Sequence, residues 1–121
     1  RNDCTMNVGV RVKPKPMSAA LKRDVARLTE LWAQGLDSFG GPFLAGPQFT
    51  AVDAFFAPVA FRVRTYGLDV GHAGQEWVHH MLGLPPMLAW EKDALMESWR
   101  EVDHEAELRA CGEVTADYRR A

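Results

Sequence analysis

The sequence predicts an all-α domain, and three observations lead to that prediction. Apolar residues recur every three or four positions between Leu21 and Leu36, which is the spacing of an amphipathic helix. Thr50 and Asp53 have the spacing of a capping box in front of an apolar stretch. No segment shows the alternation typical of a strand. We therefore expect a helical bundle built around a core helix at about 51–66.

The composition indicates one domain with a single core. The chain has 121 residues, of which 47% are hydrophobic and 25% charged, and its formal net charge is -2. This near balance, without a basic run, argues against a nucleic-acid partner. No apolar run approaches the roughly 20 residues of a membrane span. Only two cysteines are present, which fits a reducing compartment, and we expect a cytoplasmic location.

The first elements follow from caps and prolines. Residues 1–11 are expected to be the end of a helix, and Pro14 and Pro16 then impose an extended connector. Ser18 is a good N-cap for the amphipathic helix that follows. The apolar face of that helix is expected to consist of Leu21, Val25, Leu28, Leu31, Trp32 and Leu36.

The core helix follows a Gly- and Pro-rich loop. Phe49, immediately before the capping box, is placed to pack its ring on the first turn near Ala54. Pro58 lies inside the helix and is expected to bend it. Gly67 is placed to end the helix in a left-handed conformation. Phe49, Thr50 and Asp53 are therefore interpreted as structural residues.

Two further helices are expected at 72–82 and from Pro85 to about Trp99. From Arg100 onward the pattern is charged and weakly periodic, so we expect a short helix at about 104–110 and then a loosely ordered tail. The residues expected to face inward are Trp77, Val78, Met81 and Leu82 in the first of these helices, and Leu88, Trp90, Leu95, Met96 and Trp99 in the second.

The loop phrase Phe-Gly-Gly-Pro-Phe-Leu-Ala-Gly at 39–46, the capping box and its helix at 49–59, and the phrase Leu-Gly-Leu-Pro-Pro-Met-Leu-Ala-Trp at 82–90 form a specific combination. Together they resemble the C-terminal helical domain of glutathione S-transferases, particularly the bacterial ones. Residues 1–7 resemble the second half of the long first helix of that domain. The resemblance covers residues 1–100, and residues 101–121 depart from it, so we treat them as a C-terminal extension.

The resemblance implies one half of a two-domain enzyme. An N-terminal thioredoxin-like domain binds glutathione and activates its thiol, while the helical domain supplies most of the electrophile pocket and part of the dimer contact. None of the 121 residues resembles the thioredoxin-like domain. We therefore expect no catalytic residue in this chain and no tightly bound cofactor, with glutathione as co-substrate of the joined protein. The expected partners are a hydrophobic electrophile or other small ligand and a second copy of the chain.

The resemblance also implies a set of candidate pocket residues, namely those at positions that lie near the cleft in the family. Met6, Asn7 and Val10 are the first candidates, and an ordinary helix end is the alternative interpretation for them. Arg64 and Tyr66 of the core helix are the others. Arg62 and Arg64 lie on or near a buried helix, so they are expected to pair with carboxylates or to emerge from the core at the helix end. Binding of an anionic group of the substrate is the functional alternative.

Two other groups of residues have a chemical interpretation beside the structural one, namely metal binding for one group and thiol reactivity for the other. His72, Glu76 and His80 can share one helix face, but zinc usually takes three or four ligands and nothing in the sequence completes a set. We expect a solvated helix face and no metal site. No sequence feature marks Cys4 or Cys111 as a reactive thiol, so both are expected to be buried or idle.

Two further functional hypotheses stay open at this point. One is a free-standing helical module that binds a partner or a small ligand without glutathione chemistry. The other, which the ligand count disfavours, is a metal-binding helical protein built on residues 72–80. An upstream reading frame that encodes a strand-rich thioredoxin-like half favours the transferase hypothesis, whereas a start codon directly before Arg1 favours the free-standing module.

Overall fold

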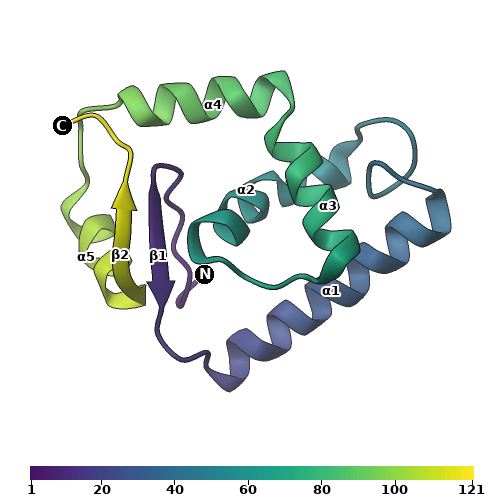
Figure 1. Cartoon of the computed structure of the whole chain (residues 1–121), viewed down its shortest axis with the longest axis horizontal. Helices are drawn as coiled ribbons and strands as arrows, with labels where there is room; N and C mark the ends of the chain where they lie inside the picture. Colours follow the sequence, from purple (N-terminus) through teal and green to yellow (C-terminus); the bar gives the residue numbers. More distant parts are fainter.

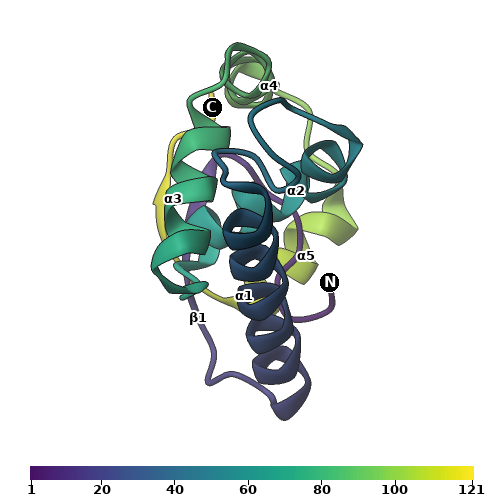
Figure 2. The same cartoon turned by 90° about the vertical axis from the view of Figure 1, so that its right-hand side faces the viewer.

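The computed structural model describes all residues 1–121 and contains five helices and one two-stranded sheet. Helix α2 lies at the centre, and the sheet and the loop between α1 and α2 lie on opposite sides of it (Figure 1). Seen from the side, α1 and α3 run next to each other and α4 lies across one end (Figure 2). The all-α prediction is confirmed, with the sheet as an addition. The elements are β1 (Val10–Pro14), α1 (Ala19–Phe39), α2 (Ala51–Tyr66), α3 (Gly71–Leu82), α4 (Pro85–Met96), α5 (Val102–Cys111) and β2 (Gly112–Asp117).

Helix α2 has the predicted bounds and forms the core. It starts with the predicted capping box at Thr50 and Asp53, contains Pro58, and ends at Gly67 with φ 61°. Its buried residues come from all sides of the helix in the last two turns, because β1 packs on one side and α3 on the other. None of the helices is long and apolar enough to cross a bilayer.

The carboxylate of Asp53 connects three parts of the fold. The side chain is fully buried. Its Oδ1 accepts hydrogen bonds from the amide of Leu44 and from Nε1 of Trp77, each at 3.0 Å. Its Oδ2 accepts from the Thr50 amide at 3.0 Å. The loop before α2, the first turn of α2 and the middle of α3 are therefore joined through one buried group.

Helix α1 begins as predicted and extends beyond Leu36, the last residue of its predicted apolar face. The Ser18 hydroxyl accepts from the Leu21 amide at 3.0 Å, which caps the first turn. The helix continues to Phe39 and ends at Gly40 with φ 79°. Trp32 is fully buried, and its ring lies 4.5 Å from that of Trp77. This contact packs α1 against α3.

The predicted contact between Phe49 and the first turn of α2 is wrong. The Phe49 side chain is half exposed, and its ring packs edge-on against Phe43 at 5.8 Å. Phe43 is fixed close by because its backbone pairs with that of Gly46. Ala54 offers only an exposed methyl group, so the aromatic ring is the larger apolar partner.

Helix α4 ends earlier and buries less than predicted. It stops at Met96, three residues before the predicted end, and Leu88, Met96 and Trp99 are exposed. Only its start packs on α3, where Met87 is buried. Trp90 also meets the core, since its ring lies 5.0 Å from Phe61.

The prediction of a helix over residues 1–11 is wrong. Residues 1–9 are irregular, and β1 begins at Val10. Val8, Val10 and Val12 are all buried, so the segment does alternate with the period of a strand. β-branched residues favour such an extended, half-buried surface over a helix.

The prediction of a loosely ordered tail is also wrong. The helix predicted at 104–110 is present as α5, but β2 follows it directly and pairs antiparallel with β1, with Val12 opposite Val114. A Cβ atom on Gly112 would collide with the carbonyl of Lys13, so this strand start needs glycine. The C-terminal residues thus cover one edge of β1.

Replacement of Asp53 by alanine is expected to lower the free energy of unfolding by about 3 kcal/mol, because buried donors of Leu44 and Trp77 lose their acceptor and each such loss costs roughly 1–3 kcal/mol. Thr50→Ala is the matched variant, and the usual capping loss is about 1 kcal/mol. Urea denaturation of the two variants measures both. Equal losses would show that the capping box alone carries the effect of Asp53.

Candidate functional site

The irregular N-terminal segment 2–9 is held on α2 by side chains from the last two turns of that helix. Three of them donate hydrogen bonds to backbone carbonyls of the segment. This fixes the segment without any regular secondary structure of its own. The bonds run from Arg62 Nε to Cys4 O at 3.0 Å, from the Tyr66 hydroxyl to Thr5 O at 2.8 Å and from the Thr65 hydroxyl to Asn7 O at 2.6 Å.

Two cavities adjoin this segment and share Met6 and His104, and we call them the Met6 cavities. The first has a volume of about 500 Å³, and Arg62 and Glu107 are among its lining residues. The second is smaller, about 220 Å³, and Trp90 and Trp99 contribute to its lining. Both cavities therefore combine apolar and charged side chains.

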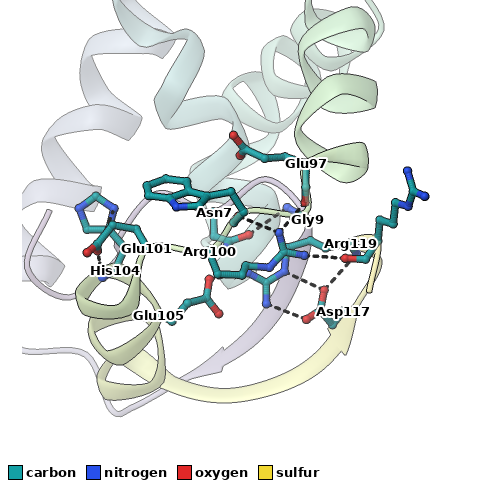
Figure 3. A network of polar contacts seen from close by, with 11 residues as sticks. Asn7, Gly9, Glu97, Arg100, Glu101, His104, Glu105, Asp117 and Arg119 are labelled. Carbon is teal, nitrogen blue, oxygen red and sulfur yellow. Dashed lines mark hydrogen bonds and ion pairs between the residues drawn. The ribbon is translucent and has the colours of Figure 1, made fainter.

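The wall of the second cavity is held by a polar network between α4, α5 and β2 (Figure 3). Arg119 forms ion pairs with Glu105 and Asp117. Its hydrogen bonds to Asp117 lower the pKa of that carboxyl and raise the pKa of the guanidinium. Arg100 donates to backbone carbonyls of the loop after α4 and of the C-terminal segment. Arg119 and Arg100, which line this cavity, are therefore held in place by contacts within the chain.

The N-cap of α5 places His104 at both cavities. The Glu101 carboxylate accepts from the His104 amide at 2.6 Å, and this bond lowers the pKa of the Glu101 carboxyl. The carboxylate also lies 3.8 Å from Nδ1 of His104. The imidazole is exposed and can donate to or accept from a ligand.

The structure brings together two of the predicted pocket residues, Met6 and Asn7. Both line the second cavity, and the Asn7 side chain accepts from the Gly9 amide at 3.1 Å. Val10 is different, because it is fully buried in the hydrophobic core and lines neither cavity. Its place in strand β1 turns it toward α2 and away from solvent.

Arg64 and Tyr66 have other surroundings. Arg64 forms an ion pair of 2.8 Å with Glu91 and lines a separate cavity of about 430 Å³ beside α3. Pairing with a carboxylate was one of the alternatives for this residue. Tyr66 is buried, and burial raises the pKa of its phenol. Its hydroxyl supports the segment that carries Met6 instead of facing a cavity.

Sequence reasoning did not assign Trp90, Trp99, Arg100 or His104 to this site. The two tryptophans were interpreted as inward-facing residues of one helix, and the other two lie where the resemblance ends. The segment 90–104 holds two of the four tryptophans, but its charged residues are mainly acidic and its composition indicates no site. The opposite wall of the second cavity comes from residues 6–9, far away in the sequence.

His72 and Glu76, two residues of the hypothetical metal site, lie on one face of α3 as expected. His72 Nε2 lies 3.4 Å from Glu76 Oε1, and both side chains are largely exposed. No group of three or more His, Cys, Asp or Glu side chains is arranged to hold a metal ion. The structure thus offers no third ligand for this pair.

Cys4 and Cys111 are both free and buried, as expected. The Cys111 thiol lies 3.9 Å from the Thr5 hydroxyl. Burial, with Cys111 nearby, raises the pKa of the Cys4 thiol to about 11. A thiol with this pKa is a poor nucleophile at neutral pH, because the thiolate is the reactive form.

Alkylation of Cys4 by iodoacetamide at pH 8 is expected to be about 100-fold slower than that of an ordinary thiol, since the pKa rises from 9.0 to about 11 and the thiolate fraction falls accordingly. The rate should increase as the pH approaches about 11. Mass spectrometry of tryptic peptides 2–11 and 110–119 separates the two cysteines. The same reaction in denaturant is the control, and equal rates in native and denatured chain would contradict the burial argument.

Comparison with known proteins gives one match. The family of the glutathione S-transferase C-terminal domain matches residues 17–93. No curated protein and no solved structure matches. The matched segment runs from just before α1 into α4 and includes the capping box with its buried Asp53. Because it spans more than half of the chain, the protein belongs to the glutathione S-transferase C-terminal domain family.

Proposed function

We propose that this chain forms the substrate-pocket and dimerisation domain of a cytoplasmic glutathione S-transferase-like protein. The observation that carries the proposal is the position of Met6, which the donors of α2 hold where both cavities meet. In this proposal the two cavities bind a hydrophobic electrophile and the polar part of its glutathione conjugate.

The lining of the Met6 cavities supports an aromatic electrophile. Trp90 and Trp99 supply large apolar surfaces on one side, and Met6 supplies a flexible apolar side chain on the other. Arg62 lines the first cavity and uses only Nε for the Cys4 carbonyl. Its terminal nitrogens can pair with a carboxylate of the peptide part of a conjugate.

Catalysis requires a group that this chain does not supply. Glutathione reacts as the thiolate, which needs a hydrogen-bond donor or a helix N-terminus beside the sulfur. The Tyr66 hydroxyl donates to the Thr5 carbonyl, and the side chain is buried, so it is not available to a glutathione sulfur. We propose that a thioredoxin-like domain joined to the chain provides the donor and binds glutathione as co-substrate.

Self-association is proposed from membership of the family and not from an exposed patch. Phe39, Phe55 and Trp99 are each more than half exposed, but they lie in three different parts of the surface. Single exposed apolar residues of this kind are ordinary on a protein surface. In this proposal the joined protein is a homodimer.

The chain alone is expected to show no conjugation of glutathione to 1-chloro-2,4-dinitrobenzene above the uncatalysed rate, since the thiolate-stabilising donor is missing. The dinitrophenyl conjugate should still bind and quench tryptophan fluorescence. Trp99→Ala should weaken that binding about tenfold, the effect of losing one aromatic anchor.

Phe55→Ala is the matched control, because Phe55 is also an exposed aromatic residue but lies on the first half of α2. Turnover by the chain alone would refute the account of catalysis. Equal affinities of the Trp99 and Phe55 variants would refute the pocket and favour a free-standing module that binds another ligand.

A further inference from the structure

A second groove lies between α1 and α2, beside the loop that joins them. Its volume is about 470 Å³, within the range of roughly 300–1,000 Å³ typical of small-molecule sites. None of its ten lining residues is charged, and none of them lines the Met6 cavities. In Figure 1 this loop and the sheet are at opposite sides of the molecule. The groove is therefore separate from the site described above.

The groove contains a buried hydrogen-bond donor that has no acceptor. Trp32 is one of the lining residues and is fully buried, and its Nε1 has no hydrogen-bond partner. The neighbouring indole of Trp77 differs, because its Nε1 donates to Asp53 at 3.0 Å. A buried donor without an acceptor is unfavourable and rare in native proteins.

The contacts of the Trp32 ring bear on the direction of its N–H. A Cβ atom on Gly74 would lie 3.4 Å from Cε3 of Trp32, so that edge of the indole faces α3. Nε1 is on the opposite long edge of the ring system. Phe56 of α2 packs against Trp32 with ring centroids 5.5 Å apart at 82°. An N–H···π contact in such a pair is only a weak substitute for a hydrogen bond.

The side chains around this donor define the chemistry of a ligand. Phe39, Leu44, Val52 and Phe56 give an apolar lining with two aromatic rings, which suits an aromatic body. A charged ligand would lose hydration without gaining a counter-charge, so the ligand must be neutral. An acceptor oxygen on it would complete the hydrogen bonding of Trp32.

We propose that this groove binds a small neutral aromatic molecule whose carbonyl oxygen accepts a hydrogen bond from Nε1 of Trp32. The ligand class follows from the uncharged lining, the two aromatic rings and the unpaired donor. This binding activity is independent of glutathione chemistry and of the Met6 cavities.

The probe for the test is prodan, a neutral naphthalene ketone whose emission shifts to the blue in apolar surroundings. The full chain is expected to bind one equivalent. Trp32→Phe keeps an aromatic ring and removes the donor, and it should weaken binding about fivefold, the effect of one neutral hydrogen bond. Phe55→Leu is the matched control and should leave the affinity unchanged, because Phe55 lines neither the groove nor the Met6 cavities. The ketone-free analogue 2-(dimethylamino)naphthalene should bind the wild-type chain and Trp32→Phe equally.

A second variant and a second measurement keep the test decisive if Trp32→Phe disturbs the core. Ala45→Trp places a bulky ring in the groove lining from an exposed position and should abolish binding of both compounds. In a ¹⁵N-correlated spectrum of the wild-type chain, which has four tryptophans, prodan should move the Trp32 indole signal downfield and the analogue should not. Unchanged prodan binding in Trp32→Phe or Ala45→Trp, or no downfield shift of that signal, would overturn the proposal.

Discussion

The buried carboxylate of Asp53 is the interaction on which the rest of the structure depends. A charged group without solvent is stable only when donors surround it, and here they come from the loop, the helix start and α3. The bond to Trp77 fixes the indole against which Trp32 packs, so it also sets the position of α1. The arrangement of α1 and α3 around α2 thus rests on one polar group in an apolar core.

The opposite end of α2 has a different role, because its side chains position the N-terminal segment. Arg62, Thr65 and Tyr66 donate to three carbonyls of a stretch that has no regular structure. One half of the helix therefore organises the bundle, and the other half organises the wall of the Met6 cavities. This division lets a single helix hold two separate parts of the fold in place.

The sequence predicted well where structure is local. Caps at Ser18, Thr50 and Gly67 and the bounds of α2 depend on neighbours within a few residues, and those spacings are visible in the chain. The donors to Asp53 from Leu44 and Trp77 are 9 and 24 residues away, so the spacing of the capping box could not reveal them. Strand β1 was missed because three alternating valines are a weak signal and its partner lies at the other end of the chain. The candidate site combines both difficulties, since residues 6–9 face residues 90–104.

The pairing of β1 with β2 has a consequence for how the protein moves. Val12 and Val114, which face each other, are 102 positions apart, and closing a loop of that length costs about 4 kcal/mol of chain entropy. Such long-range contacts raise the contact order, so the sheet should form after the helices and open before them. Arg119 and Glu105, which wall the second Met6 cavity, belong to this late-forming unit or pack on it. Opening of the sheet would therefore remove part of the wall of that cavity, while the hydrogen bonds of Asp53 lie outside the sheet.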